Sequence, residues 1–206
     1  MRKIDKGAPI ASFSDFVRTH HPVKWEDAKD VSRLWREYIL VYEQHNMSGY
    51  TEKPLLLDGS HIDHFRKQSL FNAFVFDWNN FVVDGVDETY GARFKDKYVK
   101  SCEDNEKLIN PVTEDASRYF KYELNGNIAA VTGLPPVDSA RADYTIKAFN
   151  LNEASLSERR RIIINTILDA YQDLSDELIL EALDAEGFKS VVEQLLKERK
   201  QEEDSI

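Results

Sequence analysis

The feature that most limits the possible folds is a change in hydrophobic period near residue 47. Residues 24 to 46 carry apolar side chains at three- and four-residue spacing, which predicts one amphipathic helix in the core: Val31, Leu34, Trp35, Tyr38, Val41 and Tyr42. From Tyr50 to about Asn110 this period is lost, and Gly, Pro, Asn and Asp divide the chain into short pieces. The apolar runs at 54–57 and 73–76 predict short strands within a loop-rich region.

The remainder of the chain combines a hairpin with helices. An Asn125-Gly126 pair stands between two strand-like runs and predicts a β-hairpin over residues 118 to 131. A helix is expected from Ser157, and a last helical segment from about 175 to 203 with a break near Gly187. We therefore expect an α+β protein. Its parts are an N-terminal helical region (1–46), a core (47–110), and a hairpin with a C-terminal helical region (111–206), packed as one unit.

Composition limits the class of protein further. The 206 residues are 42% hydrophobic, enough to bury a core, but no apolar run approaches the ~18 residues of a membrane span. Without a signal-peptide pattern at the start, we expect a cytoplasmic protein. One cysteine excludes an internal disulfide and a cysteine-based zinc cluster. The net charge of -10 is unfavourable for binding nucleic acid, so a local basic cluster at 93–100 or 159–161, or a partner, would have to supply positive charge.

The stretch His61-Ile62-Asp63-His64, with Asn80 sixteen residues later, carries the groups needed to hydrolyse a phosphodiester bond. That reaction needs a base to activate water and a cation held by suitable ligands. Adjacent side chains on a strand point to opposite faces, so Asp63 and His64 need a twisted ββα hairpin to converge. Asn80 would then lie on the return strand or turn, where its amide can tie the loop and orient the imidazole. Alone, the stretch also fits surface histidines, a zinc pair or a hydrogen-bonded structural cluster.

Further pieces of sequence occur around this stretch in the order seen in one family. They are Met1 to Gly7, Tyr42-Glu43-Gln44, Ser48 to Glu52, His61 to Arg66, Asp77 to Phe81, Phe94-Lys95-Asp96, Ile109-Asn110-Pro111, Tyr122 to Ile128, Thr145-Ile146, Leu151-Asn152 and Arg159. Over roughly residues 1 to 165 the chain resembles the PtuB family of HNH endonucleases, found in Septu and retron-type anti-phage systems. The resemblance implies a ββα-metal (HNH) nuclease core with N-terminal and C-terminal helical additions.

The same resemblance assigns roles to individual residues. His64 resembles the general base, Asp63 a carboxylate on the metal and Asn80 the middle Asn of the motif, whereas His61 matches a family histidine without an assigned role. Asp96 is the expected last metal ligand, with alternatives at Asp84, Asp87 and Glu88. Flanking phosphates would be held by Arg66, Arg93 and Lys95.

Metal content is a further expectation from the family. Where many relatives carry Cys-x-x-Cys, this chain has Ser48-Gly49-Tyr50-Thr51, so no structural zinc is expected. Packing would replace it, through Tyr50, Leu56, Phe65, Phe74, Phe76 and Trp78. The separate catalytic site, with oxygen and imidazole ligands, would suit Mg²⁺ or Mn²⁺.

The expected function is that of an HNH endonuclease effector. The resemblance implies a PtuA-like ABC-type ATPase as partner and, in retron systems, a reverse transcriptase with its msDNA. The nucleic acid substrate stays open between DNA and an RNA such as host tRNA. Two other functions are compatible with the sequence: a binding or scaffold subunit whose nuclease site has decayed, and a stand-alone protein-binding helical module.

Overall fold

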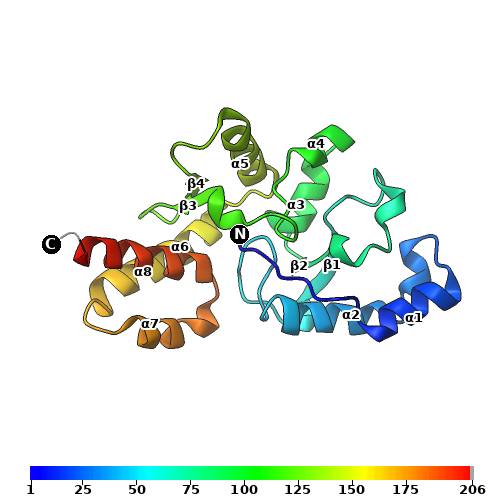
Figure 1. Ribbon diagram of the computed structural model, residues 1–206, viewed down its shortest axis with the longest axis horizontal. Helices are drawn as coiled ribbons and strands as arrows, with labels where there is room; N and C mark the ends of the chain where they lie inside the picture. The colour runs from blue at the N-terminus through cyan, green and yellow to red at the C-terminus, as the bar shows by residue number, and fades with distance from the viewer. Residues whose placement is uncertain (205–206) are drawn as a thin grey trace.

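Helices surround two small antiparallel sheets in the computed structural model, which describes residues 1–204 (Figure 1). The helices are α1 (Ala11–His20), α2 (Ser32–Tyr38), α3 (Gly91–Tyr98), α4 (Cys102–Glu106), α5 (Pro136–Ala148), α6 (Ala154–Asn165), α7 (Asp176–Ala182) and α8 (Lys189–Glu203). The strands are β1 (Ser60–His64), β2 (Phe81–Gly85), β3 (Phe120–Tyr122) and β4 (Ile128–Ala130). Short 3-10 turns cover Trp25–Ala28, Leu57–Gly59, Asn72–Phe74 and Trp78–Asn80, and π-helical turns cover Ile39–Glu43 and Thr166–Ala170. The α+β class is therefore confirmed.

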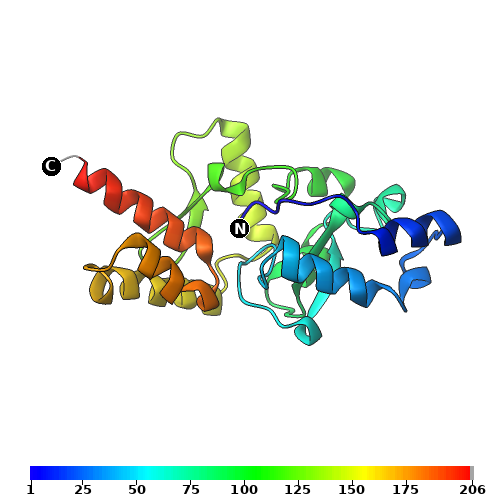
Figure 2. The same cartoon turned by 60° about the horizontal axis from the view of Figure 1, so that its bottom comes forward.

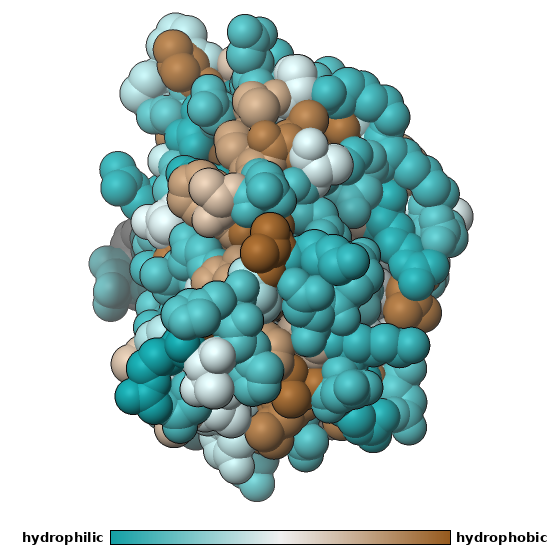
Figure 3. Space-filling model, turned by 90° about the vertical axis from the view of Figure 1, so that its right-hand side faces the viewer, coloured by the Kyte–Doolittle hydropathy of each residue, from teal (hydrophilic) through white to brown (hydrophobic). Residues whose placement is uncertain are grey.

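The molecule is elongated, with α1 and α2 at one end and α6, α7 and α8 at the other (Figures 1 and 2). Buried apolar side chains form three clusters. One joins α1 and α2 to the inner face of β1 and β2, a second fills the middle, and a third lies among the C-terminal helices. The surface at the α1 end is mostly hydrophilic, with apolar atoms in separate spots (Figure 3). Among the described residues, no helix is both long and apolar enough to cross a membrane.

The predicted helix over residues 24 to 46 is wrong in its continuity and partly in its buried face. It is divided into a 3-10 turn, α2 and a π-helical turn. Leu34 and Tyr42, expected in the core, are 54% and 69% exposed, whereas Ile39 and Leu40 are buried. A π-helical turn holds more residues than an α-helical one and shifts the phase of the side chains. The spacing pattern assumed a single period and could not follow that shift after residue 38, whereas the exposure of Leu34, which precedes the π-helical turn, depends on how α2 packs.

The strands predicted at 54–57 and 73–76 are also not where the strands form. Residues 73–76 lie in turns; of residues 54–57 only Pro54 pairs, in an isolated antiparallel bridge with Met47, and Leu56 is 82% exposed. The strands are β1 and β2, five residues each, paired antiparallel with His61 opposite Asp84 and Asp63 opposite Val82. All of β2 is buried, so it can cover the core on one face and pack against α3 on the other.

In the C-terminal half, the structure agrees more closely with the elements predicted from the sequence. β3 and β4 form the predicted hairpin, and Gly126 in its turn has φ +85°, as such a turn requires. The expected break at Gly187 is confirmed by its φ of +72°. Helix α6 begins at Ala154 rather than Ser157, and α5 was not predicted although Pro136 at its first turn is a recognised start signal.

Candidate functional site

The two-stranded sheet places the expected site residues on different faces. His61 and Asp63 are two residues apart on β1 and share a face, while Ile62 packs into the apolar cluster on the other. His64 ends the strand, beside the loop that leads to Val75. Asp63 and His64 nevertheless line one cavity of about 520 Å³. The convergence that the sequence demanded of this pair is therefore present.

Asp63 is a buried carboxylate held by two donors. Its Oδ2 accepts a hydrogen bond from the Tyr50 hydroxyl at 2.5 Å and from the Lys95 ammonium at 2.6 Å. Burial favours the neutral acid, but the Lys95 charge and these two hydrogen bonds outweigh it and hold the pKa of Asp63 below its usual value. Asp63 is thus ionised inside the protein, and Lys95 is the cation that compensates it.

His64 is fixed in one tautomer by its surroundings. Its Nε2 lies 2.9 Å from the carbonyl oxygen of Val75, which can only accept, so Nε2 must carry the proton. Trp25 and Phe81 meet the imidazole ring edge-on at 4.8 and 5.2 Å between centroids. Burial lowers the pKa of His64 below its usual 6.5, so the ring is neutral at pH 7. Its Nδ1 then carries a lone pair and can accept a proton.

Asn80 ties together the loop between the two strands. Its Oδ1 accepts from the Arg66 amide at 2.7 Å, and its Nδ2 donates to the carbonyls of Arg66 and Phe74 at 3.1 and 3.0 Å. Val75, which holds the imidazole of His64, directly follows Phe74. Asn80 therefore acts on His64 through hydrogen bonds to the loop backbone.

The cavity collects most of the residues expected to do chemistry. Its lining includes His61, Asp63, His64 and Asp96, together with Lys24, Trp25, Lys67, Gln68, Ser69, Asn72 and Val75. Two buried atoms there have no hydrogen-bond partner among the described residues, namely Nδ1 of His61 and Oδ1 of Asp96. Burial and the neighbouring Asp63 charge raise the pKa of Asp96, although the charges of Lys95 and Lys67 partly offset them. Asp96 is thus less firmly held as an anion than Asp63, whose pKa is lowered.

The residues expected to hold phosphates are not gathered at this cavity. Arg66 lies over the Phe74 ring, 4.2 Å from its centroid, and lines a different cavity. Arg93 pairs with Glu88 at 2.6 Å on the surface, and Lys95 is 1% exposed. The 159–161 cluster does not form a basic surface either, because Arg160 is buried and its neighbours pair with Glu186 and Glu158.

The alternatives to Asp96 are engaged elsewhere. Asp84 is buried and accepts from the Ser48 hydroxyl and from the Ala92 amide in the first turn of α3. Asp87 pairs with Lys53, and Glu88 pairs with two cations of α3. Asp96 is the candidate that the structure brings to the cavity with Asp63.

Several residues of the site were not identified from the sequence. Tyr50 was expected only to pack, and nothing in the local pattern placed Lys24, Trp25 or Lys67 near residue 64. Lys67 also donates to the carbonyl of Asp96 at 2.6 Å, which secures the end of α3 to the loop. These contacts join segments far apart in the chain, which no spacing rule connects.

The residues that line this cavity do not form a suitable site for the divalent cation that the resemblance implies. In the part of the chain that is described, no three His, Cys, Asp or Glu side chains form a group able to hold a metal. Mg²⁺ requires near-octahedral oxygen ligands at roughly 2.0–2.1 Å. The inner oxygen of Asp63 is already shared by Tyr50 and the Lys95 ammonium, which also lies 3.4 Å from Asp96. The expected Asp63–Asp96 ligand pair therefore has a lysine between its members.

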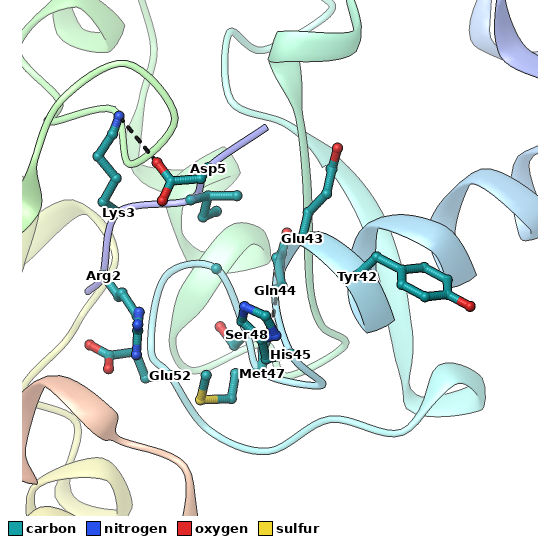
Figure 4. A pocket seen from close by; sticks show the side chains of 12 residues that line it. Arg2, Lys3, Asp5, Tyr42, Glu43, Gln44, His45, Met47, Ser48 and Glu52 are labelled. Carbon is teal, nitrogen blue, oxygen red and sulfur yellow. Dashed lines mark hydrogen bonds and ion pairs between the residues drawn. The ribbon is translucent and has the colours of Figure 1, made fainter. Parts of the chain in front are cut away.

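A second cavity, of about 180 Å³, lies between the N-terminal segment and the residues that follow α2 (Figure 4). Its buried acid, Glu43, pairs with Lys6 at 2.7 Å and accepts hydrogen bonds from the Gly7 amide and the Trp78 indole. This charge anchors the N-terminal segment to the π-helical turn. The first cavity is the stronger candidate, because it combines a neutral histidine with two carboxylates and two lysines.

Comparison with models of known protein families finds no match, and comparison with curated proteins finds no similar sequence.

Proposed function

We propose that this chain is an endonuclease that hydrolyses phosphodiester bonds, with His64 as the general base. The observation that carries the proposal is a hydrogen bond: Nε2 of His64 donates to the Val75 carbonyl, which leaves Nδ1 able to accept a proton. Burial also lowers the pKa of His64, which favours the neutral imidazole. A base held in one tautomer beside an open cavity can take a proton from water. The resemblance to PtuB nucleases supports the same role for His64.

The reaction follows from the groups at the cavity. His64 Nδ1 takes a proton from water, the hydroxide oxygen forms a bond to phosphorus, and the bond from phosphorus to the 3′ oxygen breaks. The departing oxygen takes a proton from solvent. Lys24 and Lys67 line the cavity and supply positive charge for the phosphate, in place of the arginines expected from the sequence.

The biological setting is part of the proposal and is supported by the resemblance alone. We propose an anti-phage effector in the cytoplasm that works with a PtuA-like ABC-type ATPase, and in a retron-type system also with a reverse transcriptase and msDNA. A partner with a basic surface would offset the net charge of -10, which disfavours binding nucleic acid unaided. DNA and a host RNA such as tRNA are both candidate substrates.

One observation favours a second function. The Asp63–Lys95 ion pair fills the place where a metal-dependent nuclease needs its ion. A chain that had lost catalysis would keep the fold and serve as a nucleic-acid-binding or scaffold subunit of the same complex. The two functions differ in whether His64 affects cleavage.

Cleavage of plasmid DNA and of total tRNA separates them. The chain is tested alone and with its ATPase, as wild type and as His64→Gln, which keeps an N–H donor for Val75 but removes the base. We expect the variant to lose about 10²- to 10⁴-fold in rate while binding nucleic acid as before. His20→Gln, an exposed histidine of α1, is the matched control. Equal cleavage by wild type and His64→Gln would refute catalysis by His64, and binding without cleavage by either would favour the scaffold function.

A further inference from the structure

We propose that Lys95 is the built-in cation of the site, and that its ammonium excludes a divalent metal ion from Asp63 and Asp96. The part of this inference that concerns the reaction rests on the proposed function. Its structural part, the exclusion of the metal, depends only on the contacts of Lys95.

The contacts of Lys95 are those of a bound cation. Its Nζ lies 2.6 Å from Asp63 Oδ2, 3.0 Å from the carbonyl oxygen of His64 and 3.4 Å from Asp96 Oδ1. These acceptors come from β1 and from α3 itself, and the Lys95 side chain is 1% exposed. Oxygen atoms are also the ligands that a divalent ion such as Mg²⁺ takes.

A metal ion and this ammonium cannot share the site. Both would approach the same oxygen of Asp63, and a divalent ion bound there would lie within a few ångströms of the ammonium. Repulsion between like charges at that distance is strong away from water. The ammonium and the metal ion therefore cannot both occupy the site. Lys95 is the one that stays, because helix α3 places its side chain there.

Removing Lys95 should convert the site into a metal site. Two carboxylates, Asp63 and Asp96, would remain next to the cavity, and the Oδ1 atom of Asp96 is buried there without a hydrogen-bond partner. Carboxylate oxygens suit Mn²⁺, and water molecules would supply its remaining ligands. The vacated side chain would leave space for the ion between Asp63 and Asp96.

Lys95 also positions the base. Its hydrogen bond to the carbonyl of His64 links α3 to the end of β1, at the residue that carries the imidazole. Lys95 is therefore a positioning residue and touches no substrate. A divalent ion that replaced it could not donate this hydrogen bond.

Counting bound Mn²⁺ by electron paramagnetic resonance tests the exclusion without an activity assay. We expect no bound equivalent for wild type, one for Lys95→Ala and none for Lys95→Ala combined with Asp63→Asn. Lys97→Ala removes an exposed lysine of the same helix and is the matched control, expected to behave as wild type. Mn²⁺ should raise the melting temperature of Lys95→Ala and leave that of wild type unchanged.

One equivalent of Mn²⁺ bound by wild type and lost in Asp63→Asn overturns the inference. That measurement stands even where Lys95→Ala fails to fold, because it needs no lysine variant. In the cleavage assay, wild type should remain active in EDTA, and activity that requires Mg²⁺ contradicts the inference. Absence of cleavage under every condition refutes the proposed function instead, while the Mn²⁺ count still decides the role of Lys95.

Discussion

Replacing Lys95 by methionine should destabilise the protein far more than replacing it together with its partner. The side chains of Lys95 and Asp63 are 1% and 4% exposed, so neither charge is solvated by water. Lys95→Met leaves Asp63 ionised and buried with only the Tyr50 hydrogen bond from a side chain. The double variant with Asp63→Asn removes both charges, and the amide oxygen can still accept from Tyr50.

The expected magnitudes follow from the burial of the pair. Breaking a buried ion pair by removing one partner costs about 3–5 kcal/mol, whereas replacing both partners by neutral groups is often close to neutral. In a chain of this length, the single variant should melt on the order of 10 °C lower than wild type. The two single changes should therefore not add, and the interaction energy should amount to several kcal/mol.

Urea unfolding of the wild type, both single variants and the double variant measures this interaction energy. Lys97→Ala, which breaks an exposed ion pair with Glu88, should change the unfolding free energy little and serves as the control. If the effects of Lys95→Met and Asp63→Asn add to within about 0.5 kcal/mol, the buried pair does not exist in solution and the reasoning fails.

Three further results are expected. Burial lowers the pKa of His64 below 6.5, so His64 remains unprotonated and able to act as a base as the pH falls past 6.5. The value of kcat/KM should therefore decline only at lower pH, and a decline with a midpoint at or above pH 6.5 contradicts this. Asn80→Ala loses three hydrogen bonds and should lower the unfolding free energy, measured by urea unfolding, by about 3 kcal/mol. A change near zero would show that these hydrogen bonds do not hold the loop. Gly126→Ala should lower the melting temperature more than Gly133→Ala. Both glycines have φ near +85°, but only at Gly126 would the new Cβ lie 1.9 Å from the Ser157 carbonyl oxygen. Equal decreases in melting temperature would refute the clash.

The sequence by itself determined the features that depend on neighbouring residues. The turn at Asn125-Gly126 and the break at Gly187 were predicted correctly, since a backbone with positive φ favours glycine wherever it occurs. The approach of Asp63 to His64, and the tie that Asn80 makes across its loop, were also expected, because these residues lie within one short strand-and-turn segment.

Only the tertiary structure decided which face of α2 is buried and what surrounds the site. The π-helical turn that follows α2 shifts the side chains after residue 38, and its extra residue has no signature in apolar spacing. Lys95 illustrates the limit most clearly. In the sequence it stands in a basic run and suggests a phosphate contact, yet α3 turns it inward onto Asp63, thirty-two residues earlier in the chain. Whether a charge meets solvent, substrate or a buried partner is set by long-range packing, and the pattern around it does not contain that information.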